Sequence, residues 1–380
     1  MQQPSATSKM TKLKVLFLTS ASIKEIPDHI PEFQQFSQDF EMVYHEVTTA
    51  EAFIDSLQND PKLQDFSGLY LTGAFSVMGR DFSQFIPYFP DTLKVASFPW
   101  VGAESFRPDL FKERGILVGN VGDGSADDVA DIALSLTLSA FRFTSYLESR
   151  LRESGDTNQA RNTLGSYELD PKTKMPALAP MDNDRTKGVH LGGKHVVSPR
   201  GKVAGIIGLG AIGKAIAVRL NAIGMSICYN KRTALSQAEL DSFSFPLTYV
   251  ESIDELLPQL DLLVLAVPHS PQTVNLINEE SIKLVKPGIR IVNVGRGSAI
   301  DEEVLLKALD DNVVTSFASD VFQHEPKIDE RFLKRFDVAL LPHMGPYTTD
   351  NFQGNHKRVM RNIAGVLKGV DPRELGIINL

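Results

Sequence analysis

After a polar stretch at residues 1–10, short apolar runs alternate with segments of helical periodicity. In the first third of the sequence the apolar runs, each bounded by turn residues or a helical pattern, lie at 13–19, 41–47, 68–72, 93–98 and 116–121. Short runs bounded in this way are typical of β-strands. Because strands that alternate with helices usually form a parallel sheet covered by those helices, we expect an α/β domain here.

A second series of the same kind begins after residue 200. Its predicted strands lie at 203–207, 225–230, 247–250, 261–267, 290–294, 313–319 and 338–341. The helical patterns between them cover 212–223, 252–257, 279–286 and 301–309. Gly224 directly follows the first of these patterns, as a helix-ending glycine does. The sequence therefore predicts two α/β units in tandem.

The segment between the two series has a different character. A helical pattern runs from Ser125 to about Arg152, with Asp127, Asp128 and Asp131 in its early turns, where negative charge suits the helix dipole. Residues 153–199 then carry prolines at 171, 176, 180 and 199 among many charges and show little periodicity. We interpret this stretch as a loop-rich insertion.

Composition excludes several classes of protein. Of the 380 residues 42% are hydrophobic and 23% charged, as in an ordinary globular protein, and the net charge of −8 has the wrong sign for binding a phosphate backbone. We therefore expect no nucleic-acid partner. Cys228 is the only cysteine, which excludes an intramolecular disulfide, and no His/Cys/Asp cluster has metal-site spacing. We expect no metal.

Membrane segments are not expected either. The longest apolar run, at 262–267, is far shorter than the roughly 20 residues needed to cross a bilayer. Lys9, Lys12 and Lys14 precede the apolar run at 15–18, but that run is too short for a signal peptide and is better explained as the first strand. A cytoplasmic location follows as the default expectation.

A glycine motif follows the first strand of the second series. Gly208, Gly210 and Gly213 fit the pattern G-x-G-x-x-G, with Ala211 and Ile212 inside it, and a helical pattern begins there. The first glycine would permit a tight turn, the second a close approach of a pyrophosphate, and the third close packing of helix on strand. This context predicts a dinucleotide site at the helix N-terminus. The alternative is a glycine-rich turn without a ligand.

The end of the next strand should read the adenosine ribose of such a cofactor. It carries Asn230, Lys231 and Arg232, with no carboxylate where NAD recognition would require one. The two cations are suited to a 2′-phosphate, so we expect NADP(H) to be preferred, with NAD(H) possible. The competing interpretation is a solvated basic turn.

Three further motifs follow later strands of this series. They are Val294-Gly295-Arg296-Gly297, the stretch from Asp320 to His324-Glu325-Pro326, and Pro342-His343-Met344-Gly345. In this order after a glycine fingerprint, they resemble the D-isomer-specific 2-hydroxyacid dehydrogenases. The resemblance implies that Arg296 binds the carboxylate and keto oxygen of the substrate, and that His343 donates and accepts the proton. It also implies that Glu325 holds His343 and that Asp320 faces the nicotinamide.

The chemistry of this reaction independently favours these residue types. An imidazolium can protonate a keto oxygen near neutral pH, a carboxylate against the ring raises its pKa, and an arginine fork fits a carboxylate. Singly, each residue also has an ordinary structural interpretation: Arg296 as a surface charge, Glu325 as a loop residue and His343 as a core histidine. Three such residues at strand ends favour a catalytic site.

Further contacts are expected on each side of the reaction. For the cofactor we predict contacts from Val267, Pro268, Thr273 and Val294. By the same resemblance the substrate meets backbone amides at Val101 and Gly102, and the loop from Thr72 and Gly73 to Phe75 closes over it. The family's glycine pattern is replaced here by Trp100-Val101-Gly102-Ala103-Glu104, so Trp100 and Phe75 shape a larger pocket or belong to the core.

The resemblance also implies a fold class: α/β, with two doubly wound Rossmann-like domains and an interdomain cleft. Residues 1–121, completed by 346–380, would form the substrate-binding domain. Residues 122–345 would form the NAD(P)-binding domain, with the insertion at about 153–199. The family is usually homodimeric, and we expect a homodimer.

The function expected from these observations is hydride transfer between NADP(H) and a small 2-keto or 2-hydroxy acid, as in glyoxylate/hydroxypyruvate reductases. One alternative is a D-mandelate-type dehydrogenase of aromatic 2-hydroxy acids. Another is a dinucleotide-sensing binding protein similar to the corepressors that share this fold.

Overall fold

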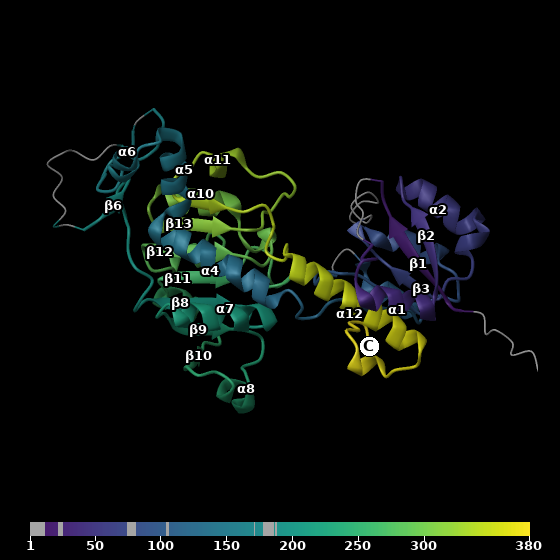
Figure 1. Cartoon of the computed structure of the whole chain (residues 1–380). Coiled ribbons are helices and arrows are strands. Elements are labelled where there is room, and N and C mark those ends of the chain that lie inside the picture. The colour runs from purple at the N-terminus through teal and green to yellow at the C-terminus, as the bar shows by residue number, and fades with distance from the viewer. Residues whose placement is uncertain are drawn as a thin grey trace, which may run out of the picture. The chain divides into compact units, whose positions relative to one another are not determined.

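The computed structural model describes residues 12–21, 26–73, 81–103, 106–170, 172–177, 186 and 188–380. The chain forms two compact units (Figure 1). Unit 1 contains residues 1–125 and 347–380, and unit 2 contains residues 126–346. The chain thus leaves unit 1 once and returns to it with its last segment.

Unit 1 is built on a five-stranded parallel sheet with the order β2-β1-β3-β4-β5. Its strands are β1 (Lys14–Thr19), β2 (Glu41–Glu46), β3 (Gly68–Tyr70), β4 (Val95–Ser97) and β5 (Leu117–Gly119). Its helices are α1 (Pro31–Asp39), α2 (Ala50–Asn59), α3 (Pro108–Glu113) and α12 (Thr349–Leu367). This strand order is that of a flavodoxin-like doubly wound sheet.

Two apolar layers cover the sheet of unit 1. On one face α1 and α12 pack together, and Val359 and Ile363 of α12 lie in a cluster with Phe17 and Phe33. The C-terminal helix, yellow in Figure 1, therefore completes the core of the N-terminal unit. The opposite face carries an aromatic cluster in which buried phenylalanine rings contact one another, among them Phe53, Phe82, Phe85, Phe98, Phe106 and Phe111.

Unit 2 is built on a seven-stranded parallel sheet with the order β10-β9-β8-β11-β12-β13-β14. Its strands are β8 (Val203–Ile207), β9 (Ser226–Asn230), β10 (Leu247–Tyr249), β11 (Leu262–Leu265), β12 (Ile289–Asn293), β13 (Val314–Ser319) and β14 (Val338–Leu340). The strand order reverses between β8 and β11, as in the Rossmann fold. The expected α/β class and two-domain architecture are confirmed.

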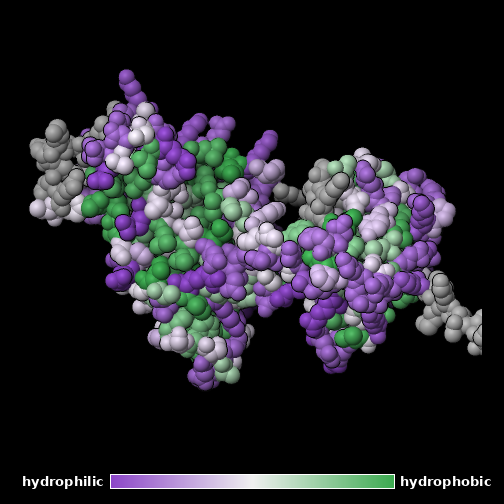
Figure 2. Space-filling view, viewed as in Figure 1, coloured by the Kyte–Doolittle hydropathy of each residue, from purple (hydrophilic) through white to green (hydrophobic). Residues whose placement is uncertain are grey.

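Helices cover both faces of this second sheet. Unit 2 contains α4 (Ala126–Arg142), α5 (Thr144–Ser154), α6 (Thr157–Arg161), α7 (Ala211–Ala222), α8 (Gln237–Asp241), α9 (Ile253–Leu256), α10 (Glu302–Asp310) and α11 (Glu330–Leu333). One face is packed by α4 and α7, and the other by α9, α10 and α11. On the face seen in Figure 2, hydrophobic residues gather more over unit 2 than over unit 1.

Two helix predictions are wrong. The pattern from Ser125 to about Arg152 predicted one helix, but Phe143 adopts a left-handed conformation (φ 53°) and separates α4 from α5. The pattern at 279–286 predicted a helix, but only the 3-10 turn Ser281–Lys283 forms. There Asn278 Oδ1 accepts hydrogen bonds from the backbone N–H groups of Glu280 and Ser281. A side chain that caps the turn in this way competes with helix propagation.

The segment at 153–199 is attached to unit 2 by a short hairpin of β6 (His190–Leu191) and β7 (Lys194–His195). Lys194 is buried, and its Nζ lies 2.6 Å from a carboxylate oxygen of Asp337, which is also buried. The same Nζ donates to the carbonyl oxygens of Leu309 and Val314. Arg335 also pairs with Asp337, with its Nε 2.8 Å from Oδ1 and its Nη2 2.9 Å from Oδ2. The hairpin is thus joined to the sheet by a buried ionic cluster.

The described part of the chain contains neither a membrane-spanning helix nor a metal-binding group of side chains. None of its helices is long and apolar enough to span a bilayer. Within the same residues, no three His, Cys, Asp or Glu side chains are grouped as a metal ion would require.

Candidate active site

The glycine motif forms the turn between β8 and α7. Gly208 has φ +98°, a conformation that favours glycine, and a Cβ atom there would lie 2.6 Å from the carbonyl oxygen of Ala266. A Cβ on Gly213 would lie 2.1 Å from the carbonyl oxygen of Gly208. A Cβ on Gly210 would meet nothing within 4 Å. Gly208 and Gly213 therefore allow the turn to close, whereas Gly210 leaves open space above the helix start.

That open space lies at the N-terminus of α7. The helix has 12 residues, begins with Ala211 and Ile212, and its N-cap Gly210 provides no side chain to bind the first backbone N–H groups. Such a helix start binds phosphate groups through its free N–H groups and its dipole. The residues present therefore fit the pyrophosphate of a dinucleotide.

The neighbouring strand ends come together at this turn. A Cβ on Gly208 would contact the side chain of Val267 at 2.9 Å, and a Cβ on Gly295 would lie 2.6 Å from the carbonyl oxygen of Val267. Val294 directly follows β12, which pairs with β11. Thr273 caps the turn after Val267, because its hydroxyl donates to the carbonyl oxygen of Pro268 at 2.7 Å. Val267 and Val294 thus border the turn from neighbouring strands, and Pro268 and Thr273 lie in the adjoining loop.

At the end of β9, Asn230 and the two cations have different environments. The backbone of Asn230 accepts the N–H of Gly208 at 3.0 Å, which places this strand end beside the glycine turn. The side-chain amide of Asn230 donates to the carbonyl oxygens of Val250 and Glu251. Lys231 is half-buried and Arg232 is exposed, and neither forms an ion pair with another described residue. Asn230 therefore holds the next loop; that the two cations bind a 2′-phosphate stays a prediction.

His343 and Glu325 form a direct pair. The Nδ1 atom of His343 lies 2.8 Å from Oε2 of Glu325, and the other carboxylate oxygen accepts the backbone N–H of Phe322 at 2.8 Å. His343 has φ +55°, and a positive φ in a residue other than glycine is uncommon outside functional or strained sites. The carboxylate is therefore fixed by its own loop, and it fixes one face of the imidazole ring.

Asp320 supports the loop that carries His343. Its two carboxylate oxygens accept the backbone N–H groups of Met344 and Gly345, each at 2.8 Å. Burial raises the pKa of Asp320, although these two N–H groups oppose the shift. Asp320 is thus placed next to the His343 loop at the end of β13; whether it also faces a nicotinamide stays a prediction.

Arg296 follows β12 and lies close to this pair. It is half-buried, and its Nη1 donates to the carbonyl oxygen of Gly295 at 2.8 Å. The next residue, Gly297, contacts the backbone of Phe322 so closely that a Cβ would lie 1.9 Å from its carbonyl carbon. Arg296, Glu325 and His343 are therefore brought together after the ends of β12, β13 and β14, which are neighbours in the sheet.

The protonation of His343 follows from its neighbours. The hydrogen bond to Glu325 raises the pKa of His343, partial burial opposes this, and the charge of Asp320 adds to the rise while that of Arg296 lowers it. The net pKa lies above the ordinary value for histidine. The site therefore holds an imidazole that is more readily protonated at neutral pH than a free histidine.

The predicted substrate residues lie in unit 1. The hydroxyl of buried Thr72 donates to the carbonyl oxygen of Leu18, and Gly73 follows it in the chain. The carbonyl oxygen of Val101 accepts the side-chain amide of Asn120 at 2.7 Å, and Gly102 is half-buried beside it. Their contact with a substrate stays a prediction.

Trp100 and Phe75 are the aromatic residues expected either to shape a larger pocket or to belong to the core. Trp100 packs on the core of unit 1, with ring centroids 5.2 Å from Phe98 and 5.8 Å from Phe106. Phe75 and Glu104 lie outside the described residues.

Sequence reasoning missed the residues that hold these loops. Asn120 supports Val101, and Asn355 on α12 donates to the carbonyl oxygen of Pro99 at 3.3 Å. Glu302 binds the loop of Glu325 through the N–H of Gln323. No local sequence pattern marks the contacts of these residues, because their partners lie far away in the sequence.

The fold and this arrangement define a class of protein, the dinucleotide-binding oxidoreductases with a Rossmann-type sheet. Residues 181–345 match the family model for the D-isomer specific 2-hydroxyacid dehydrogenase, NAD binding domain. A Saccharomyces cerevisiae protein named provisionally as a 2-hydroxyacid dehydrogenase is 34% identical over 348 residues, 86% of each chain. The chain therefore belongs to the D-isomer specific 2-hydroxyacid dehydrogenase family of NAD(P)-dependent enzymes.

Solved structures agree with this placement. The holo form of D-mandelate dehydrogenase from Rhodotorula graminis has a TM-score of 0.81 at 26% identity, covering 98% of this chain and 99% of that one. An NADPH-dependent glyoxylate/hydroxypyruvate reductase from Sinorhizobium meliloti, solved with NADP and malonate, has a TM-score of 0.71 at 25% identity, covering 94% and 95%.

Proposed function

We propose that this protein is an NADPH-preferring reductase of small 2-keto acids, with glyoxylate or hydroxypyruvate as the preferred substrate. The observation that carries the proposal is the pair of His343 and Glu325, with Arg296 beside it, after the ends of three neighbouring strands. A proton donor, its carboxylate partner and a cation suited to a carboxylate are the groups that reduction of a 2-keto acid requires.

Each residue has a defined role in this proposal. Arg296 binds the substrate carboxylate through its planar fork and polarises the keto oxygen. His343, held at Nδ1 by Glu325, donates a proton from Nε2 on the other side of its ring. When bound, the nicotinamide supplies the hydride. The raised pKa of His343 keeps the proton available at neutral pH.

The preference for NADPH rests on Lys231 and Arg232. An arginine fork can pair with a 2′-phosphate, and charge-assisted bonds of this kind contribute about 1.5–3 kcal/mol. That range corresponds to roughly 10- to 150-fold in kcat/KM. Because Arg232 is exposed, solvent and salt reduce the effect. The NADPH-dependent Sinorhizobium meliloti reductase, a structural relative, supports this choice.

The test is a panel of 2-keto acids assayed with NADPH and with NADH. We expect glyoxylate or hydroxypyruvate with NADPH to give the highest kcat/KM. The double variant K231A/R232A should lose most of the NADPH preference while its use of NADH changes little. Equal use of both cofactors by the wild type, or equal loss of both in the double variant, would refute the assignment of these cations.

A second candidate is an aromatic 2-keto acid, as for a D-mandelate-type dehydrogenase. The similarity to the Rhodotorula graminis D-mandelate dehydrogenase and the presence of Trp100 beside Val101 favour it. Including phenylglyoxylate in the panel separates the two, since a kcat/KM above that of glyoxylate would favour the aromatic substrate. As an assembly we propose a homodimer, which light scattering of the purified protein would test.

A further inference from the structure

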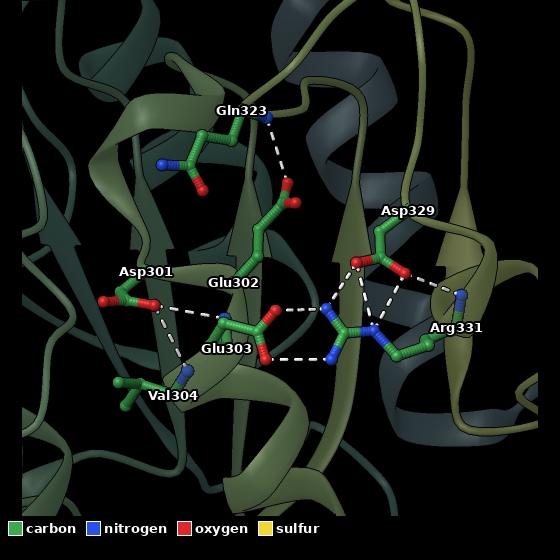
Figure 3. A network of polar contacts seen from close by, with 7 residues as sticks. All are labelled: Asp301, Glu302, Glu303, Val304, Gln323, Asp329 and Arg331. Carbon is green, nitrogen blue, oxygen red and sulfur yellow. Dashed lines mark hydrogen bonds and ion pairs between the residues drawn. The ribbon is translucent and has the colours of Figure 1, made fainter.

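A network of polar contacts joins α10 to the segment that follows β13 (Figure 3). Glu302, the first residue of α10, accepts the backbone N–H of Gln323 at 3.0 Å. Beside it, Arg331 binds both carboxylate oxygens of Glu303 and both of Asp329. Asp301, the N-cap of α10, accepts the N–H groups of Glu303 and Val304. The start of this helix is therefore fixed, and it carries one carboxylate that reaches the loop of Glu325.

Two further contacts within the described residues support that loop next to Gln323. Gln323 lies two residues before Glu325, and the loop closes on the Glu325 side chain through the N–H of Phe322. On its inner side, Gly297 contacts the backbone of Phe322 directly. Because Gly297 leads through a 3-10 turn to Asp301 and Glu302, one short segment contacts the loop twice. The first contact is van der Waals packing, and the second is the hydrogen bond from Gln323 to Glu302.

The two acids at the start of α10 are in different environments. Glu302 is half-buried, and burial raises its pKa. The hydrogen bond from the Gln323 N–H and the charges of His324 and Arg331 oppose the shift, and the charge of Asp329 adds to it. Glu303 is 73% exposed, and its partner Arg331 is 52% exposed. An exposed ion pair such as that of Glu303 and Arg331 contributes little, whereas the charge-assisted hydrogen bond from the N–H of exposed Gln323 joins Glu302 directly to the Glu325 loop. Glu302 should therefore hold the Glu325 loop in place. A substitution at the neighbouring Glu303 serves as the matched control variant.

We propose that Glu302 is a positioning residue for the pair of Glu325 and His343, acting through the backbone of Gln323. This inference rests on the proposed function of that pair as the proton donor and its partner. Glu302 itself touches neither His343 nor Glu325 in any contact recorded among the described residues. It sets where the Glu325 carboxylate stands, and so how strongly that carboxylate favours the protonated ring.

The experiment compares the variants E302A, E302D, E302Q and E303Q in the full-length protein. The titration of His343 is followed by NMR without substrate, with its signal among the eight histidines identified from the H343Q spectrum. The pH dependence of kcat/KM for reduction is measured in parallel. The groups that set the His343 titration are Glu325, Asp320 and Arg296, and none of them is altered in these variants.

In E302A and E302D we expect the pKa of His343 to fall by about half a unit or more, because Glu325 is held less firmly. Above that pKa the kcat/KM for reduction should fall by about threefold or more, with a smaller loss at acidic pH. E302Q keeps an oxygen that can accept the Gln323 N–H, so it should behave like the wild type. E303Q should also behave like the wild type, since Glu303 binds Arg331 and not the Glu325 loop.

The proposal is overturned if E302A and E302D leave the His343 titration unchanged, or if E302Q alters it as much as they do. Should E302A fail to fold, E302D and E302Q still give the comparison. Because the titration needs no substrate, a wild type that reduces none of the keto acids would refute the proposed function and leave this inference to be judged on the NMR result.

Discussion

The two units bury polar groups of different kinds. In unit 1 every buried polar side chain among the described residues is neutral, and the set includes Thr72, Ser97, Asn120, Asn355, His356 and Asn362. In unit 2 the buried set includes the charged residues Lys194, Arg290, Asp320 and Asp337. Both units are parallel α/β sheets covered by helices, so the fold does not require this difference.

The difference shows what each unit uses its interior polar groups for. In unit 1, Asn362 donates to the carbonyl oxygen of Asn120 and accepts the N–H of Gly376, so neutral amides join α12 and the C-terminal segment to the sheet. In unit 2 the buried charges lie under the His343 loop and at the hairpin of residues 190–195. Arg290, whose pKa burial lowers to about 10, rests on the ring of Phe141 and ties α4 to the sheet. Ionised groups in unit 2 therefore join separate segments.

The largest effect is expected at the charged site of unit 2. His343→Ala removes the proposed proton donor and should lower kcat for reduction by about 10²- to 10⁴-fold, with a smaller effect on KM. Arg296→Ala should change both constants, because in the proposed reaction the same side chain orients the substrate and polarises its carbonyl. Steady-state kinetics at a fixed pH measure this. Near wild-type turnover in His343→Ala would show that His343 is not the proton donor of the reaction.

The buried ion cluster should dominate the stability of unit 2. Burial alone would raise the pKa of Asp337, but Arg335 and Lys194 outweigh it and hold that pKa below its usual range, so the carboxylate is ionised. Lys194→Ala leaves this buried charge with Arg335 as its remaining cation, which should cost about 3 kcal/mol. Hydrogen exchange of β13 and β14 would measure the loss. A loss of stability below about 0.5 kcal/mol, the size usual for a surface substitution, would show that the ion pair of Lys194 and Asp337 does not stabilise unit 2.

Unit 1 should instead respond to acid through one buried histidine. His356 accepts or donates a 2.5 Å hydrogen bond with the hydroxyl of Tyr70, and burial lowers its pKa to about 4. In the unfolded chain this histidine binds a proton near pH 6.5, whereas in the folded protein it does so near pH 4. Its contribution to the free energy of unfolding is therefore fully present above pH 6.5 and is lost progressively as the pH falls towards 4. The expected loss is about 1–3 kcal/mol.

The single tryptophan makes this prediction measurable for unit 1 alone. Trp100 packs on the core of that unit, so its fluorescence reports unfolding there. Denaturant titrations between pH 7 and pH 4 should show the loss in the wild type and a flatter dependence in His356→Asn. An equal pH dependence in both proteins would place the acid sensitivity elsewhere.

The smallest effect is expected from the neutral network of unit 1. Asn362→Ala removes the partner of the Gly376 N–H and of the Asn120 carbonyl, and should cost about 1–2 kcal/mol with little dependence on salt. In Lys194→Ala, in contrast, the loss of stability should come mainly from the buried charge of Asp337, which keeps Arg335 as its remaining cation. Measuring Asn362→Ala by Trp100 fluorescence at two salt concentrations tests whether the two interiors differ as described.

Local sequence signals predicted the parts of the fold that depend on near neighbours. The strand at 203–207 and the glycine turn were found because periodicity and the three glycines act within one strand–turn–helix unit. The break at Phe143 was missed, since it has no proline or glycine to mark it. Glu302 and Asn355 were missed because their contacts join segments that only the folded chain brings together. The assignment of Lys231 and Arg232 to a 2′-phosphate stays a prediction.

The hairpin at residues 190–195 also limits how this enzyme can be divided into modules. A nucleotide-binding fragment that began at residue 200 would contain the complete seven-stranded sheet, yet it would lack Lys194. Asp337 would then keep Arg335 alone, and the carbonyl oxygens of Leu309 and Val314 would lose their donor. Such a fragment would also lack α4, which covers one face of the sheet, so a graft of this domain onto another protein should start at α4 and keep the hairpin.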